Sequence, residues 1–455
     1  MQAYARFMSK QYYYVALRDG VVCYSEGQPV PTRRSPKQPR TPVRDFFAEL
    51  GPGLITGAAD DDPSGIATYS VTGAQFGYGP LWTALFSFPL MVSVQLMCSR
   101  LAMVTGRGLA AVVRRRYPRW VLWGGCLLLV VANTVNIGAD LGGMADATQM
   151  ITGISSLVWL PLYAGLMIVL LFYSSYCTIA RIFKWLTLVL FAYVVTAFVA
   201  KPDWGQVLHA TFIPDVQWSR AYLSVLVGIL GTTISPYLFF WQAAEEVEEE
   251  RAMGRVTVAQ RQGATDRELR KSRKDIATGM FFSNFVMFFI ILTTAATLHS
   301  HGITHISTAH DAAEALRPLA GRGAYLLFTL GLMGTGMLGV PVLAGSSAYA
   351  ISEAMAWRAS LEAKPRLAPQ FYTVVALAML VGLALDFLGV DAVKMLFWAA
   401  IANGVLAPPL IVLVVLLTSD PGVMGRHVNP RWLRGMGWVA AVVMSGAAIA
   451  MFLAG

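Results

Sequence analysis

Charged residues are scarce in this chain. Asp, Glu, Lys and Arg make up 13% of its 455 residues, whereas soluble globular proteins carry about 25%. A soluble chain of this length would fold as about two or three domains, and so few charges could not cover their surfaces. Because 56% of the residues are hydrophobic, the composition excludes a soluble enzyme and a disordered protein. It predicts a polytopic membrane protein.

Cysteine is also rare, with four residues in the chain. Cys23 lies in the polar N-terminal stretch, and Cys98, Cys126 and Cys177 lie in apolar stretches. Their spacing matches neither a disulfide framework nor a zinc site. We interpret them as small apolar residues that fill space.

Long uncharged runs organise most of the chain. A helix needs about 20 residues to cross the hydrocarbon core of a bilayer. The first run is long enough for two passes and is interrupted at Gly77-Tyr78-Gly79-Pro80. Each other run supplies one pass, which predicts eleven membrane helices. The runs are 63–99, 120–139, 147–180, 185–200, 221–244, 276–310, 323–352, 367–385, 395–419 and 435–455.

Lysine and arginine are distributed unequally between the connecting segments. Thirty of the 35 lie in the N-terminal tail and in alternate segments after it; the others are Lys201, Arg220, Arg317, Arg322 and Lys394. Basic segments stay in the cytoplasm under the positive-inside rule. We therefore expect a multi-pass plasma-membrane protein with a cytoplasmic N-terminus. The net charge of +9 reflects this topology and does not indicate nucleic-acid binding.

Two polar segments stand out beside the uncharged runs. Residues 1–45 are basic and contain several prolines, which predicts a disordered cytoplasmic tail ahead of a membrane domain at 46–455. Residues 245–275 hold eight acidic and eight basic side chains and predict a solvated, partly helical cytoplasmic loop. An acidic cluster that collects cations at the inner mouth is the alternative.

Three consecutive aspartates, Asp60, Asp61 and Asp62, lie within the first predicted membrane segment, GPGLITGAADDDPSGIATYS. An ionisable side chain inside a membrane is expensive and indicates a functional site. Pro63 and Gly65 follow directly, and both disfavour a continuous helix. We expect a broken helix whose free carbonyl groups face a cavity, with Asp60 and Asp61 toward water. The alternative is a helix that begins near Pro63 and leaves the aspartates as surface caps.

A second interruption is predicted at Pro236, deep inside the run 221–244. Taken alone, this proline indicates an ordinary kink. Interrupted helices at corresponding places in two halves of a chain, however, indicate the central site of a secondary transporter. The first and sixth helices correspond in a five-plus-five inverted repeat, to which the eleventh helix is an addition.

The sequence resembles the Nramp family of divalent-metal transporters, which have eleven or twelve helices in a LeuT-type inverted-repeat fold. The resemblance covers most of the chain from about Gly51. It is densest in GPGLITGAADDDPSGIATYSVTGAQFGYGPLW and continues through RLAMVTGRGLA. It implies an all-α polytopic membrane protein with a LeuT-like fold.

The chain departs from the family at three motifs. Where family members carry Asp-Pro-Gly-Asn in the first helix, this chain has Asp62-Pro63-Ser64-Gly65. Where they carry Met-Pro-His in the sixth, it has Ser235-Pro236-Tyr237. In the third helix, family members carry an Asp and, three residues later, a Glu. This chain has Asp140 and Gly143 at these two positions. These departures resemble the Nramp-related magnesium transporter branch.

The resemblance implies a set of metal-binding positions. Asp62 would be the anionic ligand, while Gly65 and Ser235 stand where an asparagine amide and a methionine sulfur would coordinate. The main-chain carbonyls of Ala59 and Thr232 fall at the family's backbone ligands.

The chemistry of these positions favours hard cations. Thioether sulfur suits softer metals, whereas carboxylate, carbonyl and water suit magnesium and manganese. Ser235 removes the sulfur, and Gly65 removes another side-chain ligand and widens the cavity. Magnesium usually keeps several waters and binds one or two carboxylates. We therefore predict a secondary transporter, not an enzyme, that imports Mg²⁺ and Mn²⁺ as substrates by alternating access and uses no cofactor.

Proton coupling is not expected, because the two positions of the proton route are replaced. Tyr237 stands in place of the histidine and stays protonated at physiological pH, and Gly143 cannot carry a proton. Three alternatives stay open. They are a proton-coupled Mn²⁺/Fe²⁺ transporter, an ion-coupled transporter of a small organic solute on the same architecture, and a non-transporting metal sensor that signals through residues 245–275.

Other polar residues carry weaker predictions. Asn403 in the tenth helix would line the cavity or hydrogen-bond another helix. Asp140 is expected to be structural, and Asp146 has no assigned basic partner. Four histidines lie in an outer loop without the spacing of a compact tetrahedral site, with outer metal capture as the alternative; they are His299, His301, His305 and His310.

Overall fold

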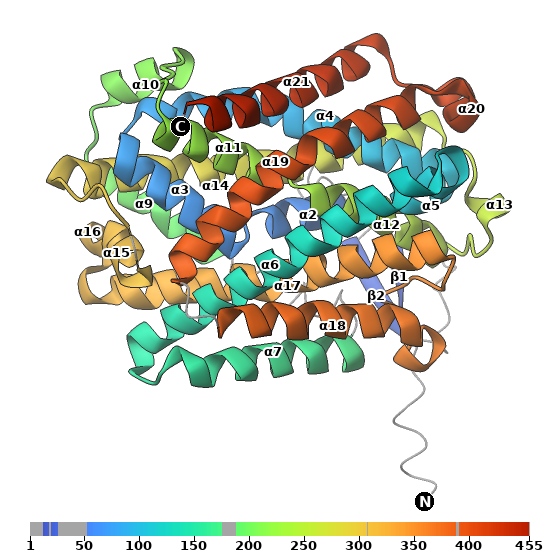
Figure 1. Cartoon of the computed structure of the whole chain (residues 1–455), viewed down its shortest axis with the longest axis horizontal. Coiled ribbons are helices and arrows are strands. Elements are labelled where there is room, and N and C mark those ends of the chain that lie inside the picture. Colours follow the sequence, from blue (N-terminus) through green and yellow to red (C-terminus); the bar gives the residue numbers. More distant parts are fainter. Residues whose placement is uncertain are drawn as a thin grey trace, which may run out of the picture.

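The computed structural model describes residues 12–17, 20–25, 52–174, 188–306, 308–387 and 391–454. Most of these residues are helical, and Figure 1 shows the long helices running side by side between the two ends of the molecule. The long helices are α4 (Trp82–Thr105), α6 (Arg119–Thr152), α7 (Ser156–Tyr173), α14 (Asp266–Thr297), α17 (Ala324–Met355), α18 (Pro369–Asp386), α19 (Ala392–Ser419) and α21 (Arg431–Leu453).

Shorter helices complete the described part of the chain. The α-helices among them are α2 (Pro52–Asp60), α3 (Pro63–Phe76), α5 (Leu109–Arg116), α9 (Phe191–Val199), α10 (Trp204–Phe212), α11 (Arg220–Thr233), α12 (Pro236–Ala252), α13 (Val258–Arg261), α15 (Ala309–Ala313), α16 (Arg317–Ala320) and α20 (Pro421–Met424). The 3₁₀ turns are Gly79–Leu81, Leu188–Leu190, His299–His301, Glu314–Leu316, Gly321–Gly323, Pro365–Leu367 and Gly425–His427.

Nine helical stretches in the described ranges are long and apolar enough to cross a membrane. One of them, Arg220–Ala252, comprises α11 and α12. The pair α2 and α3, of nine and 14 residues, corresponds to the first predicted helix in two pieces. Helix α9 belongs to the fifth predicted helix, whose first residues lie outside the described residues. Cys177, in the run 147–180 before it, also lies outside them. Cys98 and Cys126 are buried and free.

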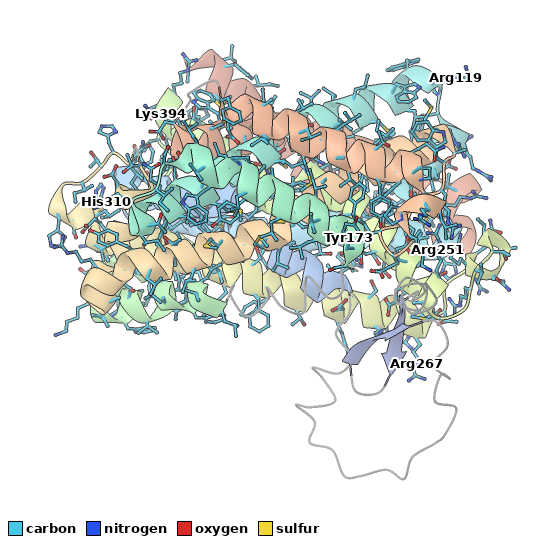
Figure 2. The ribbon with its side chains drawn as sticks, turned by 90° about the horizontal axis from the view of Figure 1, so that it is seen from below. Arg119, Tyr173, Arg251, Arg267, His310 and Lys394 are labelled. Atoms are coloured by element: carbon cyan, nitrogen blue, oxygen red, sulfur yellow. The ribbon has the colours of Figure 1, made fainter. Side chains whose placement is uncertain are left out.

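Labelled residues from the segments predicted to be cytoplasmic and external lie toward opposite ends of the bundle. Figure 2 shows Arg119, Arg251 and Arg267, all from segments predicted to be cytoplasmic, toward one end of the bundle. Lys394 and His310, from segments predicted to be external, lie toward the other end. The arrangement of the helices therefore agrees with the alternation that the basic residues predict.

Close backbone contacts hold the broken first helix in place. On α2, a Cβ atom on Gly53 would lie 2.6 Å from the amide nitrogen of Ile276, and one on Gly57 would lie 2.3 Å from the carbonyl oxygen of Gly279. On α17, a Cβ atom on Gly339 would lie 3.0 Å from the Cβ of Asp62. Small residues at these points let α14 and α17 pack directly against the chain around the break.

A hairpin lies in the stretch for which the sequence predicts a disordered tail. Strands β1 (Tyr12–Leu17) and β2 (Gly20–Ser25) are antiparallel, with Tyr12 opposite Ser25 and Leu17 opposite Gly20. The prediction of disorder does not hold for these residues, because aromatic and β-branched side chains in YYYVAL and GVVCYS favour strands. The other residues of 1–45 lie outside the described ranges.

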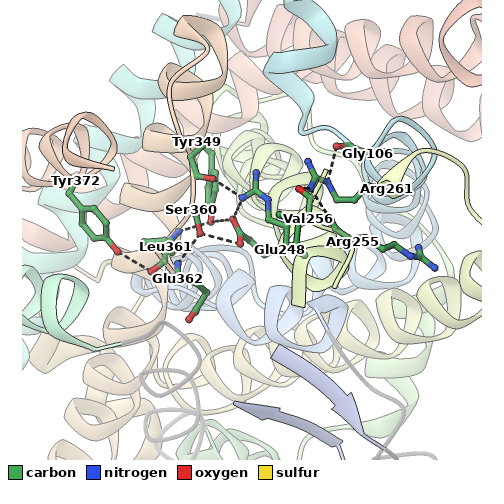
Figure 3. Close-up of polar contacts among 12 residues, drawn as sticks. Gly106, Glu248, Arg255, Val256, Arg261, Tyr349, Ser360, Leu361, Glu362 and Tyr372 are labelled. Carbon is green, nitrogen blue, oxygen red and sulfur yellow. Dashed lines mark hydrogen bonds and ion pairs between the residues drawn. The ribbon is translucent and has the colours of Figure 1, made fainter. Parts of the chain in front are cut away.

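The segment 245–275 is only partly the solvated loop that its charge predicts. Helix α12 continues to Ala252, and its Glu245, Glu246, Glu248 and Glu250 are buried, which corrects the prediction. At Glu248, hydrogen bonds compensate for the burial of the carboxylate. Figure 3 shows Glu248, which accepts bonds from Arg251 (2.7 Å) and from the Ser360 hydroxyl (3.2 Å).

Candidate functional site

The first membrane helix is broken directly before Pro63, as predicted. Helix α2 ends at Asp60 and α3 begins at Pro63, so the alternative of a helix that merely starts near Pro63 is wrong. Asp62 is the N-cap of α3, with φ −70° and ψ 170°. Its Oδ1 accepts bonds from the Gly65 amide (2.9 Å) and the Ser64 hydroxyl (2.6 Å). The carboxylate thus satisfies one of the free backbone donors at the start of α3.

The second carboxylate oxygen of Asp62 is held by two other helices. Asn136 on α6 donates its Nδ2 to Asp62 Oδ2 at 3.0 Å, and Tyr237 on α12 donates its hydroxyl to the same atom at 3.3 Å. All three side chains are buried. Four donors around one buried carboxylate favour its ionised form, so Asp62 is the candidate anionic centre of the site.

Ala59 and Gly65 lie on either side of Asp62, with other groups close to each. The Ala59 carbonyl accepts a hydrogen bond from the Tyr237 hydroxyl at 3.3 Å. A Cβ atom on Gly65 would lie 3.3 Å from the ring of Tyr69. The space beside Gly65, which the sequence suggested would be open, is therefore partly occupied by this tyrosine.

The sixth helix is also broken, because α11 ends at Thr233 and α12 begins at Pro236. The Ser235 hydroxyl bonds to carbonyl oxygens freed by the break, those of Gly231 and Thr232, each at 2.8 Å. The Thr232 hydroxyl bonds to its own helix, to the carbonyl of Ile229 at 3.0 Å. Among the described residues, no hydrogen bond joins Ser235 to Asp62, and the hydroxyl faces its own backbone.

The two third-helix positions, Asp140 and Gly143, lie in different surroundings. Gly143 faces apolar groups: a Cβ atom there would lie 2.9 Å from Leu396 Cδ1. Asp140 is fully buried, and neither of its carboxyl oxygens has a hydrogen-bond partner in the described part of the chain. Asp140 and Asp62 both lie against Gly339 of α17. An acid without a partner therefore stands next to the anionic centre.

Asp60 and Asp61 do not face water as the sequence suggested. Both are buried, and the Ser283 hydroxyl of α14 lies 2.6 Å from Asp60 Oδ2 and 3.3 Å from Asp61 Oδ1. The reason is the close packing of α2 on α14, which encloses the end of α2. Asp60 and Asp61 thus join the inner side of the break to α14, whereas Asp62 bonds to α6 and α12.

The remaining candidates lie apart from these contacts. Asn403 is buried on α19, and its Oδ1 has no hydrogen-bond partner among the described residues. Asp146 lies on α6, and His299 bonds through Nδ1 to the carbonyl of Ala74 at 2.8 Å. A cavity of about 620 Å³ opens beside His299 at the end of α3. It contains none of the predicted metal-binding residues.

The described residues contain no group of three or more His, Cys, Asp or Glu side chains arranged to hold a metal ion. The groups gathered at the break are the Asp62 carboxylate and its donors, Ser64, Gly65, Asn136 and Tyr237. Asn136 is the member of this site that the sequence did not single out. It lies in an uncharged run, where an asparagine has no pattern that separates it from a helix-packing residue.

Comparisons with known proteins show the family and the fold of the chain. Residues 53–454 match the family described as natural resistance-associated macrophage protein-like, Nramp. The "Divalent metal cation transporter MntH" of Klebsiella pneumoniae is 26% identical over 406 residues, which are 88% of this chain and 92% of that protein. The protein of the same name from Mesorhizobium japonicum is 27% identical over 410 residues, with coverage of 88% and 87%.

Solved structures show the same fold. The manganese transporter of Eremococcus coleocola superposes with a TM-score of 0.72 and 20% identity, over 92% of this chain and 88% of that one. A nucleobase-cation-symport-1 family transporter superposes with a TM-score of 0.53 and 16% identity, over 89% and 92%. The predicted all-α, LeuT-like fold is confirmed. Because the family match spans nearly the whole membrane domain, the chain belongs to the Nramp family.

Proposed function

We propose that this protein is a secondary transporter that imports divalent cations, Mg²⁺ and Mn²⁺, by alternating access. The observation that carries the proposal is Asp62, a buried carboxylate at the break of the first membrane helix, held by donors from three helices. A charged group at that depth indicates an ion pathway. The divalent-metal transporters to which the chain is similar support this choice of substrate.

The preference for hard cations follows from the side chains at the two breaks. No sulfur or nitrogen ligand stands at Gly65 or Ser235, and the nearby acceptors are carboxylate, carbonyl and amide oxygens. Such donors suit magnesium and manganese better than softer metals. This supports the similarity to the magnesium branch that the motifs at these two positions indicate.

Alternating access would act through α2, the inner half of the broken helix. In the structure α2 lies directly on α14 through Gly53 and Gly57, and this packing would close the inner side of the break. Opening α2 would release the ion to the cytoplasm. The membrane potential would drive import, since about 2.3 kcal/mol is gained per charge per 100 mV, or about double for a divalent ion.

We further propose that transport is not coupled to protons. The position of the family's third-helix glutamate, Gly143, is surrounded by leucine side chains, Leu332 and Leu396. Tyr237, at the histidine position, is a hydrogen-bond donor to Asp62 and Ala59. Neither position offers a group that titrates near neutral pH.

One observation favours the alternative, a proton-coupled Mn²⁺/Fe²⁺ transporter. Asp140 is buried beside Asp62, so a second carboxyl group that can carry a proton stands next to the proposed ion site. The two candidate functions thus differ in a measurable property, the movement of protons with the cation.

The topology completes the proposal. We propose that residues 46–455 form one transporter domain in the plasma membrane, with the N-terminus in the cytoplasm. Supporting this are the 30 basic residues in alternate segments and the labelled arginines at one end of the bundle.

Flux into sealed liposomes tests the proposal. Vesicles containing the protein and a pH-sensitive dye receive Mg²⁺, Mn²⁺ or Ca²⁺ under an inside-negative potential. We expect uptake of Mg²⁺ and Mn²⁺ without a protein-dependent change of internal pH. Asp62→Ala is the control and should abolish uptake. Absence of any cation flux in the parent protein would contradict the function, and acidification that tracks uptake would favour the proton-coupled alternative.

A further inference from the structure

Asn136 on α6 is a buried asparagine that hydrogen-bonds directly to the carboxylate of the proposed ion site. Its side chain is inaccessible to solvent, and its Nδ2 donates to Asp62 Oδ2 at 3.0 Å. Its Oδ1 is buried and has no hydrogen-bond partner among the described residues. A buried acceptor without a partner costs about 1–3 kcal/mol, and native proteins rarely keep one without a reason.

A comparison within the same helix separates Asn136 from a packing residue. Asn133, also buried on α6, donates its Nδ2 to α17, to the Leu343 carbonyl (3.0 Å) and to the hydroxyls of Ser346 and Ser347. Its Oδ1 is likewise unpartnered in the described part of the chain. Asn133 thus joins two helices, whereas the amide of Asn136 is directed at the anionic centre.

The orientation of the Asn136 amide depends on what occupies Asp62. In the structure the carboxylate accepts a hydrogen bond, and Nδ2 faces it as the donor. A cation bound to Asp62 would repel Nδ2 and attract an oxygen. The terminal amide torsion of asparagine is broad and roughly two-fold, so a half-turn exchanges Nδ2 for Oδ1 while the backbone stays in place.

Neither of the two positions at which the family carries a side-chain ligand offers a side-chain amide here. Gly65 has no side chain and lies against Tyr69, and Ser235 bonds to the backbone of its own helix. We infer that Asn136 supplies, from α6, the amide oxygen that coordinates the transported cation beside Asp62. The ligand lost from the first helix at Gly65 is replaced from the third helix. This inference rests on the proposed function and names a further residue of the same site.

Two substitutions at this position distinguish a ligand from a residue that only orients Asp62. Asn136→Leu removes the oxygen and the donor together. Asn136→Asp keeps an oxygen ligand but cannot donate when ionised, and it places a like charge beside Asp62. A ligand role predicts that the Asn136→Asp variant binds Mn²⁺ at least as tightly as the parent. An orienting role predicts that it binds more weakly than the leucine variant.

The experiment measures Mn²⁺ and Mg²⁺ binding to the purified full-length chain by calorimetry, with thermal unfolding recorded for each variant. We expect Asn136→Leu to weaken binding by about ten- to a hundredfold. Asn133→Leu is the matched control: it should lower the unfolding temperature and leave the affinity unchanged. Equal affinity in Asn136→Leu and the parent, or an Asn136→Asp variant weaker than Asn136→Leu, would overturn the inference while the proposed function stands. A parent protein that binds neither ion would overturn both.

Discussion

Asp62→Asn separates the charge of the central carboxylate from its role in the fold. The amide oxygen can still accept bonds from Ser64 and Gly65, which now hold Asp62 Oδ1 at 2.6 and 2.9 Å. The amide nitrogen would face Asn136, whose unpartnered Oδ1 can turn to accept from it. Tyr237 would lose Asp62 Oδ2 as an acceptor but can still donate to the Ala59 carbonyl, so we expect a change in the free energy of unfolding below about 1 kcal/mol.

The effect on ion binding is much larger. Two unit charges 4 Å apart interact by about 4 kcal/mol at an effective dielectric constant of 20, and a divalent ion doubles this to about 8 kcal/mol. Desolvation of the ion and the carboxylate offsets most of that gain. If about a quarter remains, some 2 kcal/mol is lost with the charge, and the affinity for Mn²⁺ falls by about 30-fold.

Calorimetric titration with Mn²⁺ and a thermal unfolding curve for the same preparation give both quantities. Asp60→Asn is the matched control, since Asp60 bonds to Ser283 on α14 and not to the donors around Asp62. We expect its affinity to stay close to that of the parent. An Asp62→Asn variant that unfolds like the parent and binds Mn²⁺ equally well would refute the assignment of the ion to this carboxylate.

Three further outcomes follow from the structure. Ser235→Met introduces a thioether and should shift uptake toward Mn²⁺ over Mg²⁺; an unchanged ratio in a competition assay would contradict this. Gly57→Leu should hold α2 away from α14, because even a Cβ would lie 2.3 Å from the Gly279 carbonyl oxygen. In this variant transport should fall, and a cysteine placed on α2 should react faster with thiol reagents added from the inside. Reaction rates equal to those of the parent protein would argue against α2 as the inner barrier. Arg251→Met leaves the buried Glu248 without the guanidinium 2.7 Å away, so we expect a loss of about 2–3 kcal/mol in unfolding free energy, which a denaturation series in detergent would measure.

Much of the architecture follows from local features of the sequence. Uncharged runs reveal membrane helices because every charge in the bilayer is costly. The breaks at Pro63 and Pro236 are predictable because proline lacks a backbone donor and ends the preceding helix. The aspartates before Pro63 mark the site for the same energetic reason. These features depend on residues that are neighbours in the chain.

The tertiary structure alone decides which groups surround the carboxylates. Asn136 contacts Asp62 across 74 residues of sequence, and Ser283 reaches Asp60 across 223. Nothing in the local pattern distinguishes these two residues from other polar residues in membrane helices. The burial of Glu248 likewise depends on Ser360, which belongs to a distant segment. Proline and charge act on their own stretch of chain, whereas a hydrogen-bond partner is chosen by how the helices pack.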